Sequence, residues 1–422
     1  MECGGKRSAT PLWFSCNKMK APSPLRSAGA FQIRPMELSP ANIAALNDYF
    51  AGRKKAIVAF TRALVEAESP SGDEAGSKAV VSLLAAAAEA INGVIKIERV
   101  ASENYGEHLR LRLAGDAPKA KPILMLGHTD TVHPRGSLGQ RPWRVEANRA
   151  YGPGVFDMKA NCALALEVIR ACVETGVRPE RPIVLLLTCD EETGSLTGRQ
   201  LIEAEARNAH AVLVLEPPAS GGRVKTGRKG TGIFSIAAHG RAAHAGLEPE
   251  KGASAILELA RQTDRLHALN GEANGISVNV GVFHGGTVSN VVAAEARAEI
   301  DVRFSTADEA ARIESEILNL RSFDDRIQLV VKGGINRPPL ERSAKVLDLY
   351  NRAKVIAGQL NFELGETQVG GASDGNFAAA TGAAVLDGLG IDGDGAHAVH
   401  EHIMIDDIPR RGALIAGLIA TL

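Results

Sequence analysis

The sequence predicts an α/β fold in which a mixed sheet, covered by helices, is interrupted by an inserted βαββαβ domain. Two observations support this prediction. Short apolar runs typical of strands alternate with helix-like stretches up to about residue 225. From 226 to 340 the order becomes strand, helix, two strands, helix and strand, and the α/β pattern then resumes. We therefore expect a catalytic domain formed by 37–225 and 341–422, with a second domain at 226–340 inserted into it.

The first part of the expected catalytic domain contains apolar strands that are each followed by polar side chains. Ligands of open α/β sheets bind beyond the carboxyl ends of the strands, so these polar residues are candidates for a site. His128 and Asp130 follow the first strand, the acidic run 190–192 follows the second, and Glu216 follows the third. The expected strands are 123–126, 183–188 and 212–215, and the expected helices between them are 158–175 and 196–206.

The inserted segment has the strand and helix order of a ferredoxin-like domain. Its expected strands are 233–239, 276–283, 291–304 and 327–332, and its expected helices are 253–269 and 307–320. Apolar residues alternate with smaller or polar ones along 276–283, which indicates one buried face and one exposed face. A sheet with an exposed face and a free edge favours pairing with a second copy of the chain.

Composition and charge exclude several classes of protein. The 422 residues include 48 basic and 49 acidic side chains and 45% hydrophobic residues, which is ordinary for a globular protein and gives no sign of nucleic-acid binding. No apolar stretch approaches the roughly 18 residues of a membrane span. Five cysteines without a CxxC pair indicate reduced thiols and favour a cytoplasmic location. Residues 1–36 are basic, lack the apolar core of a secretory signal and are expected to form a disordered extension.

The polar residues after the strands have the chemistry of a hydrolytic metal site. Imidazoles and carboxylates without thiolates suit zinc or manganese, with a free carboxylate as base. Asp130 stands two residues after His128 and could orient its ring, and the turn at 152–154 brings Asp157 to the start of a helix. Each motif also has a plain structural interpretation: a hydrogen-bonding histidine, a helix cap, or a solvated acidic loop at 190–192.

The sequence also contains features of two functions other than a metal site. The segment 371–375 fits the GxSxG nucleophile elbow, and Ser373, Asp387 and His397 follow the order of the α/β-hydrolases. That interpretation leaves the acidic clusters unexplained, and the preceding stretch 363–368 is too polar for the buried strand that an elbow requires. The alternative of a binding protein that keeps only the fold would be indicated by a lost base or ligand, and none is missing.

The ordered motifs resemble those of one family. From about residue 40 to the end, the chain is similar to the co-catalytic zinc family of glutamate carboxypeptidases, aminoacylases, acetylornithine deacetylases and succinyl-diaminopimelate desuccinylases. The Gly-Pro-Gly turn makes it most similar to the glutamate carboxypeptidase branch. The motifs that carry the resemblance are His128 to Val132, Gly152 to Gly154 with Asp157 to Lys159, Asp190 to Gly194, Glu216-Pro217, and Gly395 to His397 with Glu401.

The resemblance implies a site with two zinc ions per subunit, for which Co²⁺ or Mn²⁺ could substitute. His128 and Glu216 would hold one ion, Glu192 and His397 the other, and Asp157 would bridge them. Asp130 would orient His128. Glu191 would act as general base on a water held between the metals, which would attack an amide carbonyl. One departure is His400, which stands where the family often has an asparagine.

The resemblance also implies a partner and a substrate. His244 would reach into the site of a second subunit, which implies a homodimer through the inserted domain. Asn290, Arg337 and Gly371 would contact the substrate, a small peptide or N-acyl amino acid. We therefore expect a carboxypeptidase that releases a C-terminal, acidic residue, with an N-acyl-amino-acid deacylase as the alternative.

Overall fold

The computed structural model describes residues 37–271 and 275–422. The expectation of a disordered extension at 1–36 lies outside the described residues. Within the described ranges, no helix combines the length and the apolar character needed to cross a bilayer. The cytoplasmic location favoured by the cysteine pattern stays a prediction.

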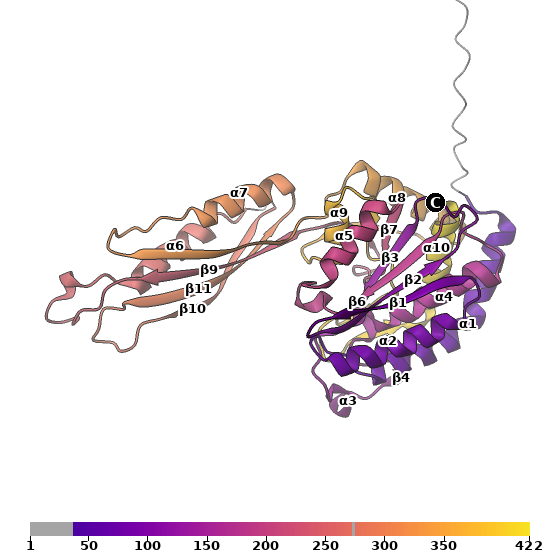
Figure 1. Cartoon of the computed structure of the whole chain (residues 1–422), viewed down its shortest axis with the longest axis horizontal. Helices are drawn as coiled ribbons and strands as arrows, with labels where there is room; N and C mark the ends of the chain where they lie inside the picture. The colour runs from indigo at the N-terminus through magenta and orange to yellow at the C-terminus, as the bar shows by residue number, and fades with distance from the viewer. Residues whose placement is uncertain (1–36, 272–274) are drawn as a thin grey trace, which may run out of the picture. The chain divides into compact units, whose positions relative to one another are not determined.

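The helices follow the expected order along the chain (Figure 1). They are α1 (Pro40–Glu66), α2 (Glu74–Glu89), α3 (Ser137–Gln140), α4 (Ala160–Glu174), α5 (Gly198–Asn208), α6 (Ala255–His267), α7 (Ala307–Leu318), α8 (Ala344–Gln359), α9 (Asp374–Ala380) and α10 (Ile408–Thr421). Single helical turns lie at Val155–Lys159, Glu191–Thr193, Pro249–Lys251 and Ile405–Asp407.

A mixed sheet forms the centre of the large part, with the strand order β1-β2-β6-β3-β7-β14. The strands β6, β3, β7 and β14 are parallel, whereas β1 and β2 are antiparallel to their neighbours. Their bounds are β1 (Val94–Ser102), β2 (Gly106–Leu113), β3 (Ile123–His128), β6 (Ile183–Thr188), β7 (Ala211–Val214) and β14 (Val385–Leu386).

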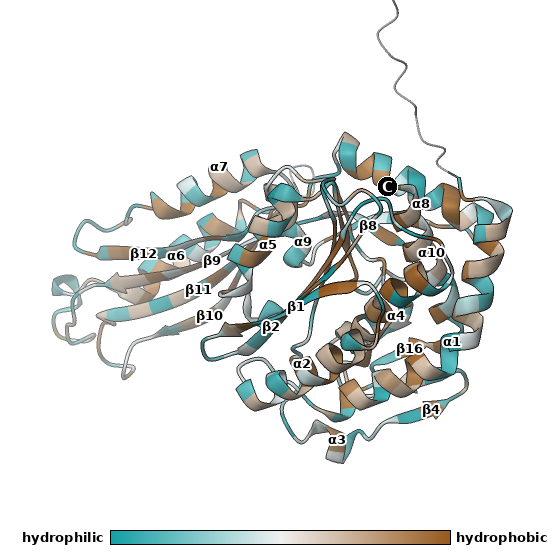
Figure 2. Cartoon of the chain, turned by 45° about the vertical axis from the view of Figure 1, so that its right-hand side comes forward, coloured by the Kyte–Doolittle hydropathy of each residue, from teal (hydrophilic) through white to brown (hydrophobic). Residues whose placement is uncertain are grey.

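Both faces of the mixed sheet are covered, which explains why β3 and β6 are continuously apolar. Ile123 and Met125 pack into a core shared with α1, α2, α4 and α10, whereas Leu124 and Leu126 pack against α5 and α9 on the other face. Figure 2 shows hydrophobic strands inside this part and hydrophilic residues on the outer sides of its helices. Because both faces are buried, only the ends of the strands are available for polar chemistry.

The inserted segment forms a four-stranded antiparallel sheet in the order β10-β11-β9-β12, with α6 and α7 packed on its buried face. This arrangement and the mixed sheet confirm the predicted fold class, while the dimerisation role stays a prediction. The strands are β9 (Gly230–His239), β10 (Ser277–Gly285), β11 (Glu295–Phe304) and β12 (Gln328–Arg337). The last strand is longer than expected because β9 begins at Gly230 and pairs with β12 as far as Arg337.

Two small sheets lie beside the ends of the large one. One has the order β15-β16-β5-β4 and the other pairs β13 with β8. Their bounds are β4 (Arg144–Glu146), β5 (Arg149–Tyr151), β8 (Val224–Arg228), β13 (Glu366–Val369), β15 (Gly393–Asp394) and β16 (His402–Met404). Because β16 pairs with β5, the C-terminal histidine segment is held next to the turn that carries Asp157.

Candidate metal centre and active site

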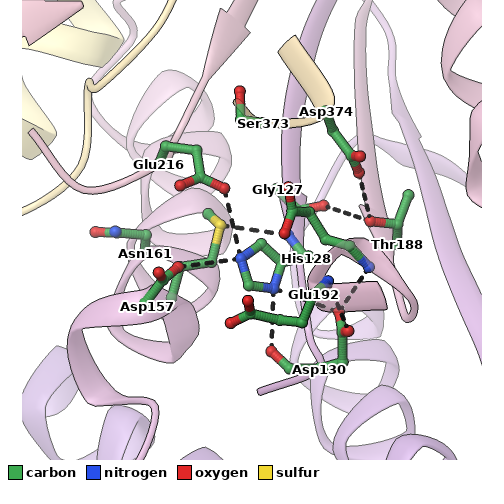
Figure 3. A network of polar contacts seen from close by, with 12 residues as sticks. Gly127, His128, Asp130, Asp157, Asn161, Thr188, Glu192, Glu216, Ser373 and Asp374 are labelled. Atoms are coloured by element: carbon green, nitrogen blue, oxygen red, sulfur yellow. Dashed lines mark hydrogen bonds and ion pairs between the residues drawn. The ribbon is translucent and has the colours of Figure 1, made fainter. Parts of the chain in front are cut away.

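His128 is the last residue of β3, and its ring is almost fully buried. Its Nε2 lies 3.1 Å from Asp157 Oδ1 and 3.4 Å from Glu216 Oε1. Figure 3 shows these carboxylates around the imidazole. His128, Asp157 and Glu216 are far apart in the sequence. They come together because the parallel strands β3 and β7 and the turn before α4 end at the same edge of the sheet. This group has the composition of one metal position.

Asp157 is delivered by the helical turn that precedes α4. The turn begins after Gly154, which has φ +70° and whose added Cβ would lie 2.3 Å from Thr131 Cγ2, so only glycine fits there. Asp157 presents Oδ1 to His128 and Oδ2 to His397, whose Nε2 is 3.5 Å away. Its two oxygens therefore face two different histidines.

Glu192 and His397 form the second half of the cluster. Glu192 Oε2 lies 3.2 Å from His397 Nε2. Glu192 Oε1 is buried without a hydrogen-bond partner among the described residues, so it has an unused ligand position. His128, Asp157 and Glu192 offer ligand atoms that all lie within 4.8 Å of one another, as a cation site requires. A histidine and carboxylate donor set of this kind fits zinc.

Burial and mutual contacts shift the ionisation of these groups in the metal-free chain. Burial raises the pKa of Glu191 well above its ordinary value and also raises the pKa of Glu192. Hydrogen bonds to Asp157 and Glu192 raise the pKa of His397 to about 10. Burial by itself lowers the pKa of His128, but the surrounding carboxylates outweigh it and the net pKa is raised. The carboxylates thus require cations for compensation, either protons or metal ions.

Asp130 contacts the acidic segment 190–192 as well as His128, which the sequence alone did not indicate. Its carboxylate accepts hydrogen bonds from the backbone N–H groups of Glu191 and Glu192, at 3.2 and 3.1 Å. His128 Nδ1 lies 3.0 Å from the backbone oxygen of Asp130 and 3.4 Å from its carboxylate. Asp130 therefore holds the metal-facing histidine and the acidic turn in one unit.

Glu191 lies beside the metal cluster and is paired with Arg337. Glu191 Oε1 lies 3.0 Å from Arg337 Nη2, and the same nitrogen donates to the backbone oxygen of Glu191 at 2.9 Å. Arg337 also contacts Asp374 Oδ1 at 3.3 Å, and the Nε of Arg337 is buried without a hydrogen-bond partner in the described part of the chain. The base candidate is thus held by an arginine from the end of β12.

A cavity of about 370 Å³ opens at the cluster. This size is within the range of small-molecule sites. Its lining includes the acidic residues Asp157, Glu191, Glu192 and Glu216, together with Phe156, Pro217, Pro218, Ala219, Lys225, Arg228, Val369, Gly371, Ala372, Ala396 and His397. Of the expected substrate contacts, Gly371 is therefore at the cavity, whereas Asn290 and Arg337 are not part of its lining.

Two of the predicted residues lie elsewhere. His244 and Asn290 are exposed in the inserted segment, where the backbone oxygen of Asn290 accepts a hydrogen bond from Ala245. His244 Nδ1 accepts from the backbone N–H groups of Gly246 and Leu247. Neither side chain lines the cavity at the metal cluster.

Ser373 does not have the geometry of a nucleophile. The strand β13 precedes the GxSxG segment and pairs with β8, but none of its residues is buried, in agreement with the polarity of this stretch and unlike the buried strand that an elbow requires. Ser373 is fully buried, donates to Asp387 at 2.7 Å and accepts from the N–H of Gly375 as the N-cap of α9. The hydroxyl is therefore committed to structure.

The C-terminal histidines have three different environments. His397 lies beside Asp157 and Glu192, and its role as a metal ligand stays a prediction. His400 is exposed, and His402 is buried with its Nδ1 2.9 Å from the backbone oxygen of His400. His400 stands at the position where the family often has an asparagine, and His397 nevertheless lies at the cluster.

Several supporting residues were not identified from the sequence. Arg228 binds Asp387 through two hydrogen bonds of 2.7 and 2.8 Å and lies 3.6 Å from Glu216. Asp374 accepts from Thr188 at 2.8 Å, next to the end of β6. In these contacts the side chain that donates and the side chain that accepts come from separate segments of the chain, so the local sequence pattern does not predict them.

Histidine and carboxylate side chains with a further glutamate beside them, at the edge of a mixed α/β sheet, indicate a metal-dependent hydrolase. The chain belongs to peptidase family M20/M25/M40, whose family model matches residues 124–421. This finding confirms the family resemblance of the motifs. The protein is therefore a metallopeptidase or amidohydrolase with carboxypeptidase-like relatives.

Individual relatives agree with this assignment. Carboxypeptidase G2 of Pseudomonas sp. (strain RS-16) is 30% identical over 374 residues, which cover 87% of this chain and 89% of that protein. Succinyl-diaminopimelate desuccinylase of Methylobacterium sp. (strain 4-46) is 27% identical over 392 residues, covering 85% and 93%. The crystal structure of aminopeptidase PepT from Bacillus cereus ATCC 10987 matches with a TM-score of 0.71 and 21% identity, covering 87% and 98%, which shows the shared fold.

Proposed function

We propose that this protein is a dizinc carboxypeptidase that cleaves an amide bond next to a free carboxylate and releases a C-terminal acidic residue. The observation that carries the proposal is the position of Asp157, whose two oxygens lie 3.1 and 3.5 Å from the Nε2 atoms of His128 and His397. A carboxylate between two histidines suits a bridging ligand. Glu216 completes one position and Glu192 the other.

Zinc supplies Lewis acidity in such a site, because it polarises a carbonyl oxygen and lowers the pKa of water. Glu191 is the proposed base. It lies next to the proposed ligand Glu192 and lines the same cavity, and burial raises its pKa well above the ordinary value, which makes its carboxylate a stronger proton acceptor. In the proposed reaction, a Glu191 carboxylate oxygen accepts a proton from the attacking water and passes it to the leaving amine nitrogen.

Positive charge near the cavity supports an anionic substrate. Lys225 lines the cavity and its side chain makes no hydrogen bond or ion pair with the described residues, whereas Arg228 is neutralised by Asp387. Arg337 is a further proposed contact with the substrate carboxylate, although it is paired with Glu191 and Asp374 and does not line the cavity. Gly371 at the cavity and Asn290 in the inserted segment are the other proposed contacts.

A homodimer is the proposed assembly, with His244 serving the site of the second subunit. The inserted segment exposes large apolar side chains in its strands, in α6 and in the loop before β11, and among the described residues no further strand pairs with its outer strands β10 and β12. The exposed residues are Ile233, Ile256, Leu257, Phe283 and Val288. His244 does not line the cavity of its own chain, which is consistent with a role in the active site of the partner subunit.

An N-acyl-amino-acid deacylase is the alternative function, since desuccinylases are among the relatives. Both reactions hydrolyse an amide beside a free carboxylate, so the metal site does not distinguish them. The distinction depends mainly on the acyl group on the carbonyl side of the cleaved bond, which is a peptidyl or folyl group for a carboxypeptidase and a short acyl group for a deacylase.

The test is amine release, followed by mass spectrometry, from folyl- and peptidyl-glutamates and from N-acetyl and N-succinyl amino acids. Protein stripped with a chelator is assayed with and without added zinc, and Glu191→Gln is the inactive control. Zinc-dependent release of glutamate or aspartate supports the proposal. Preferential cleavage of short acyl groups from ornithine or diaminopimelate assigns the chain to the deacylases, and turnover independent of metal overturns the dizinc site.

A further inference from the structure

Glu401 is a buried carboxylate next to the metal cluster that no part of the proposed reaction uses. It is 2% exposed. Its Oε1 accepts hydrogen bonds from the backbone N–H groups of Phe156 and Asp157, at 2.9 and 3.0 Å, and its Oε2 accepts from Gly154 N–H at 2.8 Å. Three backbone donors of the turn that carries Asp157 are thus satisfied by one side chain from a distant segment.

His133 supplies the fourth hydrogen bond to Glu401. The distance from His133 Nε2 to Glu401 Oε2 is 2.6 Å, and Arg141 Nη2 lies 3.2 Å from His133 Nδ1. A guanidinium group can only donate, so Nδ1 accepts and the proton of the ring is on Nε2, directed at Glu401. Arg141 Nη1 also donates to the backbone oxygen of Ala398 at 3.4 Å. The chain Arg141, His133 and Glu401 therefore orients the carboxylate from behind.

The position of Glu401 connects two ligand-bearing segments. Glu401 is four residues after His397, in the loop between β15 and β16, and it contacts the turn that carries Asp157. Gly395, with φ +82°, makes this loop tight, since an added Cβ would lie 3.0 Å from the Cα of Glu401. A change at Glu401 would therefore alter the spacing between the oxygens of Asp157 and the ring of His397.

We propose that Glu401, supported by His133 and Arg141, is a positioning residue that fixes the separation between the bridging carboxylate Asp157 and His397. It touches neither substrate nor reacting atoms. Supports of this kind commonly change metal affinity by about 10- to 100-fold when they are removed. The inference rests on the proposed function, because it assumes that Asp157 and His397 bind metal.

The experiment measures metal binding by the full chain directly, without an activity assay. Glu401→Gln keeps the size of the side chain but replaces one acceptor oxygen by an NH₂ group that faces N–H donors. Stripped protein is titrated with Zn²⁺ by calorimetry, and Co²⁺-loaded protein is examined by visible absorption and by the magnetic coupling between the two ions. We expect the weaker of two binding steps to lose about 10-fold or more in affinity. The Co²⁺ coupling should also change.

The matched control is Glu258→Gln in the inserted segment. Glu258 is 1% exposed and likewise accepts backbone N–H groups, from Phe323 at 3.0 Å and Asp324 at 3.3 Å, but it contacts no proposed ligand. It should leave both binding steps and the Co²⁺ spectra unchanged. His133→Gln, which keeps a donor on the side chain, should have an intermediate effect and serves as a second test if Glu401→Gln does not fold.

The outcomes separate the two proposals. Wild-type protein that binds two metals, together with Glu401→Gln protein that binds both with unchanged affinity and spectra, overturns the positioning role and leaves the proposed function intact. Wild-type protein that binds no metal overturns the proposed function and this inference with it. If Glu258→Gln weakens binding as much as Glu401→Gln, the effect is general destabilisation and the positioning role is rejected.

Discussion

Asp157 Oδ1 lies 3.1 Å from Nε2 of His128, although the two residues come from a turn and a strand end that are 29 positions apart. This contact joins the carboxyl end of β3 to the start of α4. It places at the edge of the sheet a carboxylate whose second oxygen faces His397, close to the acidic residues that follow β6 and β7. The proposed chemistry depends on that arrangement.

The neighbouring residues Glu191 and Glu192 should have different roles, the first in proton transfer and the second in zinc binding. We expect Glu191→Gln to bind zinc normally but to lose about 10²- to 10⁴-fold in kcat, because only the proton acceptor is removed. Glu192→Gln should instead lose zinc, since the oxygen facing His397 at 3.2 Å is a proposed ligand. Zinc content by mass spectrometry and kcat on the same preparations test both. Equal zinc content and equal activity in the two variants would contradict the assignment.

His244 should act across a dimer. His244→Ala should lose about 10²- to 10³-fold in kcat if its imidazole stabilises developing negative charge on the carbonyl oxygen. Mixing it with Glu191→Gln protein, after dissociation and reassembly, should restore roughly a quarter of wild-type activity, since half of the dimers are mixed and each has one complete site. His239→Ala, an exposed histidine of the same segment, is the control. Absence of recovery in mixed dimers would argue against a shared site.

Lys225 should determine the preference for an acidic residue. Lys225 lines the cavity, so Lys225→Met should lower kcat/KM by about 10-fold or more for substrates ending in glutamate or aspartate. Substrates that end in a neutral residue should change much less. The exposed Lys345→Met serves as the control, and the measurement is the ratio of kcat/KM values for acidic and neutral substrates. An unchanged ratio would remove Lys225 from substrate selection.

Ser373→Ala should retain turnover. The hydroxyl caps α9 and donates to Asp387, so its loss should lower the free energy of unfolding by about 1 to 2 kcal/mol. Urea unfolding and kcat measured on the same variant check the prediction. Complete loss of activity in a variant that stays folded and keeps its metal would revive the serine-hydrolase interpretation.

Acid should weaken one ion pair on the β1–β2 hairpin. Hydrogen bonds from Arg110 and Lys96 lower the pKa of Glu98 to about 2. A folded pKa below the unfolded value means that the contribution is present above about pH 4.5 and is lost as the pH falls toward 2. Because the pair is partly exposed, we expect a contribution of about 1 kcal/mol or less. The difference in unfolding free energy between wild type and Glu98→Gln, measured in urea at pH 6 and pH 3, should shrink at the lower pH.

Hydrophobic periodicity was sufficient to predict the fold. The strand 183–188 was predicted to the residue because both of its faces are buried, which leaves a sharp boundary between apolar and polar residues. The strand 291–304 was predicted too long, since its first residues are apolar but lie in a loop and the ladder with β9 begins at Glu295. Such boundaries depend on the partner strand, which the local pattern does not contain.

The sequence by itself determined the fold class and the candidate ligands. Buried strands are visible as runs of apolar residues, and the histidine and carboxylate side chains that can bind a metal are visible as residue types. Only the tertiary structure decided how these side chains are held. The carboxylate of Asp130 on the N–H groups of the acidic turn, Arg337 on Glu191, and Glu401 on the turn of Asp157 are contacts between distant segments. Their geometry follows from chain packing, since hydrogen bonds depend on distances and angles that no linear pattern specifies.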